Sequence, residues 1–99
     1  MQAISQRHKS LLVHELKLRN ALDSCRLLES DIRMMLASHQ LGQYELIYTQ
    51  KSFAARTALK ETCKRLMQSI GAKRAALNKA HNWVTEEYEA VKSLRRKRW

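Results

Sequence analysis

Apolar residues recur every seven positions along the first forty residues of the chain. The first position of this heptad holds Ile4, Leu11, Leu18, Cys25 and Ile32, and the second holds Ala21, Leu28 and Met35. Leu22 and Leu36 widen the stripe, whereas Arg7 and His14 interrupt its second position near the start. Such a repeat is typical of helices that pack along a narrow seam. The pattern predicts a helix over about 4–39.

The repeat weakens over residues 38–43, which read SHQLGQ. Gly42 suits the left-handed conformation just past the end of a helix, because glycine has no Cβ to clash there. The sequence therefore predicts a turn at about 40–43.

A second heptad repeat follows the predicted turn. Its two positions hold Cys63, Ile70, Leu77, Val84 and Val91, and Leu59, Leu66, Ala80 and Leu94. Lys73 and Glu87 interrupt the second position. Gly71 lies off the seam, where it is either a tolerated exposed glycine or a hinge. The pattern predicts a second helix over about 44–98.

Two heptad helices on either side of one short break predict an antiparallel two-helix coiled-coil hairpin, a single domain over 1–99. The absence of proline and the presence of only two glycines favour this all-α fold over turn-rich β folds. At 1.5 Å per residue, the first helix would be about 50 Å long and the second about 80 Å. The longer second helix is expected to project beyond the first, carrying Trp83, Tyr88 and the basic end of the chain.

Positive charge is concentrated in the second half of the chain. Residues 1–50 hold six Lys/Arg and five Asp/Glu, whereas residues 51–99 hold thirteen and four. Five of the seven residues 92–98 are cationic. Such an excess predicts an acidic partner: nucleic acid, anionic lipid or an acidic protein surface.

The sequence predicts neither an enzyme nor a metal or cofactor site. A two-helix hairpin has no water-poor pocket in which catalytic groups converge. The four histidines have no partner at the spacing of a zinc-binding HExxH helix. Cys25 and Cys63 are expected to be buried in the seam as small apolar groups. The lack of a secretory signal and of a membrane span of about 20 apolar residues favours a cytosolic protein with no membrane insertion.

Four explanations of the basic end follow from the residues. Lys and Arg could neutralise phosphates, although the chain has no base-reading motif. They could bind a membrane surface, although a broad apolar face opposite the cations is missing. They could complement the helix dipole and keep the hairpin soluble. They could also face an acidic protein.

A resemblance favours the protein partner. It covers residues 44–99, with an aromatic start (YELIY, KSF), an Arg-containing heptad (AKRAALNK), a tryptophan and a basic end. This stretch resembles the central stalk proteins of type III secretion systems, the flagellar FliJ and its injectisome counterparts of the SctO, YscO and InvI kind. The resemblance implies a non-enzymatic coiled-coil stalk that inserts into the hexameric secretion ATPase and links it to the export gate and to export chaperones. It implies a location in the bacterial cytoplasm, peripheral to the inner-membrane apparatus.

Carried onto this chain, the resemblance implies two binding surfaces. The surface for the ATPase would consist of Lys92, Arg95, Arg96, Lys97, Arg98 and Trp99. The surface for the export gate would consist of Leu41, Tyr44, Tyr48 and Phe53. For Tyr48 and Phe53, packing as a cap over the last seam layer is the alternative role. A basic helical adaptor that binds nucleic acid without sequence preference is the alternative function.

Overall fold

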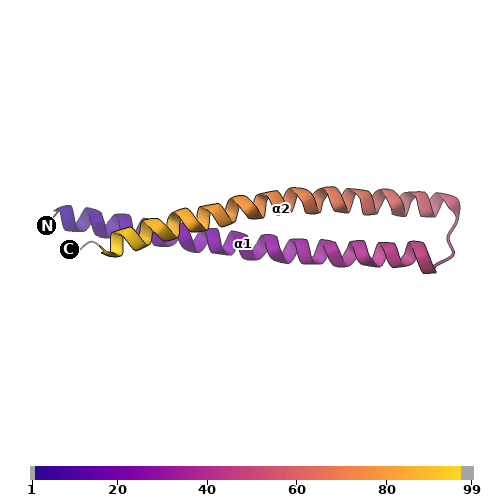
Figure 1. Ribbon diagram of the computed structural model, residues 1–99, viewed down its shortest axis with the longest axis horizontal. Helices are drawn as coiled ribbons and strands as arrows, with labels where there is room; N and C mark the ends of the chain where they lie inside the picture. Colours follow the sequence, from indigo (N-terminus) through magenta and orange to yellow (C-terminus); the bar gives the residue numbers. More distant parts are fainter. Residues whose placement is uncertain (1, 97–99) are drawn as a thin grey trace. The chain divides into compact units, whose positions relative to one another are not determined.

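The computed structural model describes residues 2–96, with side chains from residue 6 onward. This range contains two α-helices, α1 (Gln2–Tyr48) and α2 (Phe53–Arg96), and no β-strand (Figure 1). The predicted all-α helical hairpin is confirmed. The chain divides into two compact units, which we describe separately. Unit 1 combines the chain up to Leu27 with the chain from Leu77, and unit 2 is Leu28–Ala76.

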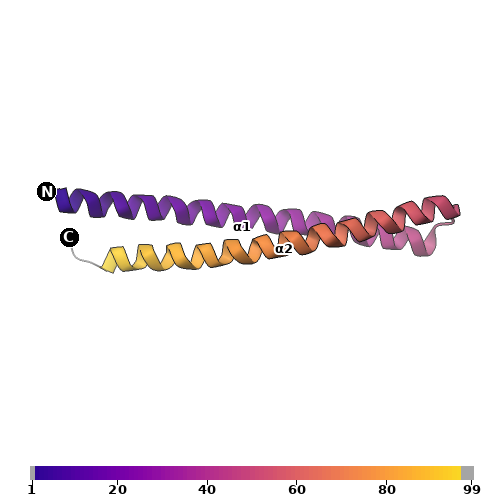
Figure 2. The same ribbon diagram turned by 90° about the horizontal axis from the view of Figure 1, so that it is seen from above.

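Unit 2 contains the reversal of the chain. Residues 49–52 connect the end of α1 to the start of α2, and the two helices run antiparallel away from this connection (Figure 2). Ser52 begins α2 as its N-cap: its hydroxyl accepts from the Ala55 N–H at 3.2 Å, and its carbonyl accepts from the Arg56 N–H at 3.0 Å. The Arg56 guanidinium donates to the Leu46 carbonyl at 2.8 Å, which satisfies an acceptor near the end of α1.

The predicted turn at about 40–43 is wrong, because α1 continues through Gly42 to Tyr48. Gly42 is buried and has no positive φ, so it does not terminate the helix. The heptad also continues through His39, Gly42 and Leu46. A Cβ added at Gly42 would lie 2.7 Å from the Sγ of Cys63. The glycine therefore makes room for a side chain of the opposite helix.

The predicted seam is confirmed in both units. Of the predicted seam residues, Ile32, Cys63 and Ile70 are buried in unit 2, and Ala21, Cys25, Ala80 and Val91 are buried in unit 1. Leu46, which the predicted seam did not include, is also buried in unit 2. Most other predicted seam residues are half-buried, namely Leu11, Leu18, Leu28, Met35, Leu36, Leu59, Leu66, Leu77, Val84 and Leu94. Leu22 differs, since 43% of it is exposed. The side chain of Ile4 lies outside the described residues.

The two charged interruptions of the second heptad are paired across the seam. Lys73 donates to Asp31 at 3.1 Å within unit 2, and Glu87 contacts the His14 ring at 2.6 Å within unit 1. An ion pair at a seam position favours one alignment of two helices over others, because a shifted alignment leaves a charge without its partner.

The prediction of a longer, projecting second helix is also wrong. α1 has 47 residues and α2 has 44. Within unit 1, α1 begins beyond the last turn of α2 in both views (Figures 1 and 2), and Arg95 contacts Glu15 of α1. The physical reason is the position of the turn. Because residues 49–52 and not 40–43 connect the helices, the end of α2 lies beside α1.

Gly71 lies inside α2, which continues through it, and a Cβ added there would have no atom within 4 Å other than those of its chain neighbours and the adjacent helix backbone. It is an exposed glycine in a continuous helix. Neither α1 nor α2, over their described residues, combines the length and the apolar character that crossing a membrane requires.

Candidate functional site

The basic end of α2 presents three described cations in unit 1. Arg95 and Arg96 are exposed in the last turn, where cations complement the helix dipole, and Lys92 is half-buried one turn earlier. Lys97, Arg98 and Trp99, which we assigned to the same surface, lie outside the described residues. The Arg95 guanidinium donates to the Glu15 carboxylate at 2.7 Å. The basic end therefore includes a contact with α1 that the predicted overhang did not allow.

Two adjoining grooves run beside this contact. One is lined by Glu15, Leu18, Arg19, Leu22, Tyr88, Val91 and Arg95; the other is lined by Tyr88, Val91, Lys92, Arg95 and Arg96. They share Tyr88, Val91 and Arg95, and we call them together the basic groove. Its apolar lining comes from both helices, and Arg19, Lys92, Arg95 and Arg96 supply its cations, which we call the rim of the groove. Sequence reasoning missed the α1 side because the misplaced turn set the end of α2 beyond α1.

A hydrogen-bonded pair, His14 and Glu87, lies on the seam of the same unit. The hydrogen bond from His14 holds the pKa of Glu87 below its ordinary value of 4.5, and the charges of His14 and Lys17 and a hydrogen bond from Trp83 act in the same direction. The Glu87 side chain is only 12% exposed. This pair occupies a seam position and is part of the packing of unit 1.

The predicted gate-binding residues lie in unit 2, on either side of the connection. Leu41, Tyr44 and Tyr48 share one face of α1, because they are three or four residues apart. The Tyr44 and Tyr48 rings lie 4.8 Å apart with a tilt of 42°. Phe53 is the first residue of α2 and is 87% exposed. We call Leu41, Tyr44 and Tyr48 the tip patch.

Cap packing does not account for these aromatic residues. Tyr44 is 58% exposed and Tyr48 is 71% exposed, and the last buried seam residue of α1 is Leu46. Exposed aromatic side chains next to a turn are available to a partner.

Sequence reasoning missed Met34 and Ile47, which are 68% and 69% exposed. With the tip patch and Ala37, Met34 forms a second stripe on α1 at spacings of three and four residues. This spacing is visible in the sequence. We overlooked it because the stripe crosses the stretch in which we expected the turn.

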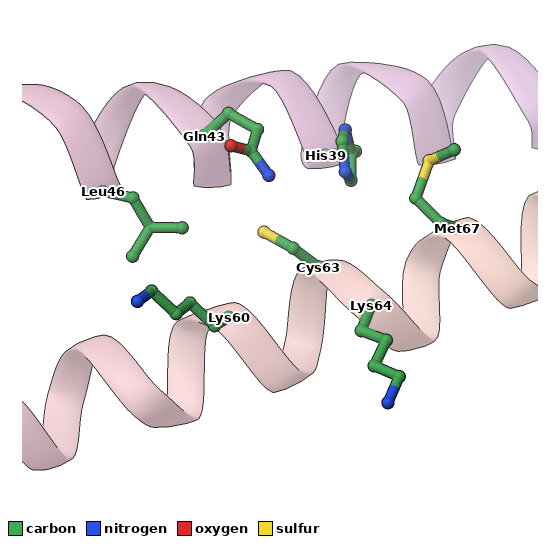
Figure 3. A pocket seen from close by; sticks show the side chains of 7 residues that line it. All are labelled: His39, Gln43, Leu46, Lys60, Cys63, Lys64 and Met67. Atoms are coloured by element: carbon green, nitrogen blue, oxygen red, sulfur yellow. The ribbon is translucent and has the colours of Figure 1, made fainter.

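A further groove in unit 2 brings a cysteine and a histidine together. Its lining is His39, Gln43 and Leu46 of α1 and Lys60, Cys63, Lys64 and Met67 of α2 (Figure 3). The Cys63 sulfur points toward α1, whereas Lys64 points away from it (Figure 3). Cys63 is 4% exposed and Cys25 is 6% exposed, so both pack as the small apolar groups that we predicted. Over the described residues, no three His, Cys, Asp or Glu side chains gather as metal ligands would.

The fold and the site together define a helical hairpin with a basic end and an exposed aromatic surface near its turn. Comparisons of the chain with protein-family models, with curated proteins and with solved structures found no match.

Proposed function

We propose that this protein is the central stalk of a type III secretion apparatus, a coiled-coil shaft whose basic end enters the hexameric secretion ATPase. The observation that carries the proposal is the exposure of Arg95 and Arg96 in the last described turn of α2, beside the N-terminal part of α1. Lys92, Arg95 and Arg96 share one face of α2, because they are three or four residues apart, and such a cationic face suits an acidic wall of the ring. The resemblance of residues 44–99 to such stalks supports the same partner.

In this proposal the tip patch and Phe53 face the export gate. Their support is exposure combined with position, since Tyr48 ends α1 and Phe53 begins α2. Aromatic side chains of this kind are enriched in protein interfaces and depleted on free surfaces. The chain would act in the bacterial cytoplasm at the inner-membrane apparatus and receive export chaperones. Hydrolysis of ATP belongs to the partner.

A basic adaptor for nucleic acid is the second candidate, and the exposed cations of α2 in unit 2 favour it: Lys60, Lys64, Arg65 and Arg74. Cations without base-reading elements predict weak binding that falls steeply as the salt concentration rises. Sequence-dependent binding in the nanomolar range at about 150 mM salt would instead support this second function.

Site-specific photo-crosslinking in the bacterial cell tests the proposal. A photoreactive residue replaces Ser93, which is exposed among the cations of the basic end, or Ala54, which is exposed next to the turn. We expect crosslinks to the secretion ATPase from position 93 and none from position 54, because only the basic end would enter the ring. Equal crosslinking from both positions, or none from position 93, would contradict the proposed function.

A further inference from the structure

The basic groove combines an apolar floor with a charged rim. Its floor consists of Leu18 and Leu22 from α1 and Tyr88 and Val91 from α2. Leu22 is 43% exposed and Tyr88 is 54% exposed, so both residues that line the groove leave surface open to solvent. Apolar residues from two neighbouring helices can accept an apolar side chain of a third helix between them.

The rim of the groove is positively charged. Arg19, Lys92, Arg95 and Arg96 stand around it, and Glu15 is the one carboxylate among the residues that line it. Glu15 is already bound by Arg95 at 2.7 Å. This contact shows that a carboxylate at the rim can accept a charge-assisted hydrogen bond from a guanidinium. Arg19 and Arg96 are exposed and make no ion pair with a described residue.

An apolar floor together with a cationic rim favours one kind of acidic partner over the others. A nucleic acid backbone would use the cations but would gain little from the two leucines and the valine. A membrane surface needs a broad apolar face opposite the cations, whereas here the apolar residues and the cations line the same groove. An amphipathic helix with acidic flanks uses both parts at once.

We infer that the basic groove binds an acidic amphipathic helix of a partner protein, with an apolar side chain inserted between Leu22 and Tyr88 and carboxylates bound by the rim cations. The inference deepens the proposed function and rests on it for the kind of partner, because both concern the same end of the chain. The partner would then contact α1 as well as α2. Its binding would need the inserted apolar side chain as much as the charged contacts.

Three synthetic peptides test the inference directly. The first is an amphipathic helix with leucines on one face and glutamates on the other, the second carries lysines in place of the glutamates, and the third is the first peptide scrambled to destroy its apolar face. Fluorescence anisotropy of labelled peptides, at an ionic strength of about 0.15 M, measures binding to the full chain. We expect binding of the first peptide alone.

Single substitutions then separate apolar insertion from charge. Leu22→Ser and Tyr88→Ser should each weaken binding of the first peptide about tenfold. Burial of one apolar contact of this size contributes about a tenfold gain in affinity. Leu27→Ser is the matched control for Leu22→Ser. Leu27 also lies on α1, is 69% exposed and does not line the groove. It should leave binding unchanged. All three positions are exposed on the surface, and thermal melts followed by circular dichroism verify the fold.

Two results would overturn the inference. The scrambled acidic peptide could bind as tightly as the first one, or Leu22→Ser and Tyr88→Ser could bind the first peptide like the unchanged chain. Failure of the proposed function looks different: the peptide would bind and respond to both substitutions, while crosslinking from position 93 would capture no secretion ATPase.

Discussion

Gly42 makes room for the sulfur of Cys63, and this contact explains a glycine inside a long helix. The glycine costs helix propensity, about 1 kcal/mol relative to alanine. A side chain there would collide with Cys63 at 2.7 Å, and Leu59 would lie 3.6 Å away. At Gly71 the same addition meets nothing within 4 Å. The two glycines of the chain therefore differ in their packing and have opposite expected responses to substitution.

Gly42→Ala should lower the melting temperature, because the collision with a buried side chain outweighs the gain in helix propensity. Gly71→Ala should raise it, by the equivalent of about 0.5–1 kcal/mol, because only propensity changes. Thermal unfolding followed by circular dichroism measures both. Adding Cys63→Ala to Gly42→Ala should restore part of the lost stability. Equal stabilisation by the two glycine substitutions would disprove the close contact.

Glu87 connects the stability of unit 1 to pH. Because its pKa in the folded chain lies below the ordinary value of 4.5, its contribution to stability is present above that value. The contribution is lost as the pH falls through the lowered pKa. Urea unfolding of the unchanged chain should therefore show a loss of stability in this acid range, and Glu87→Gln should reduce it. Glu86→Gln, at the exposed neighbouring position, is the control. An identical acid loss in all three proteins would rule out this role.

At the scale of the helices, the heptad repeat was predicted correctly from the sequence, whereas the turn was placed too early in the chain. Apolar spacing is repeated many times along each helix, so a few exceptions such as Lys73 do not obscure it. The turn depends on local signals, and Gly42 gave a false one because glycine serves both helix ends and close helix contacts. Counting the heptad on from Ile32 through His39 to Leu46 would have placed the turn after Leu46.

Ser52 is the local signal that does begin α2. Ser52→Ala should cost about 1 kcal/mol of stability, because the N–H of Ala55 loses its acceptor in the Ser52 hydroxyl. Urea denaturation measures the loss. Ser69→Ala changes an exposed serine inside the same helix, where alanine has the higher helix propensity, and should be neutral or slightly stabilising. A similar effect of both substitutions would mean that Ser52 does not act as a cap.

At the scale of the whole molecule, the sequence predicted the kind of charge at the basic end but not its surroundings. Five cations in seven residues stand out by composition alone. The apolar floor from Leu18 and Leu22 depends on which part of α1 lies beside the end of α2. If the turn is placed wrongly by a few residues, the α1 residue expected beside a given α2 residue is wrong by about twice as many, because one helix is counted too long and the other too short.

The central claim is that the basic end of α2 engages a secretion ATPase. The rate of ATP hydrolysis by the purified secretion ATPase of the host organism, measured with and without this chain, tests it most directly. We predict that the unchanged chain stimulates hydrolysis and that Arg95→Glu with Arg96→Glu abolishes stimulation. Arg96→Glu alone, which keeps the contact of Arg95 with Glu15, should weaken it. Lys64→Glu with Arg65→Glu imposes the same change of charge elsewhere on α2 and should leave stimulation intact. Normal stimulation by the Arg95→Glu, Arg96→Glu chain, or none by the unchanged chain, would contradict the claim.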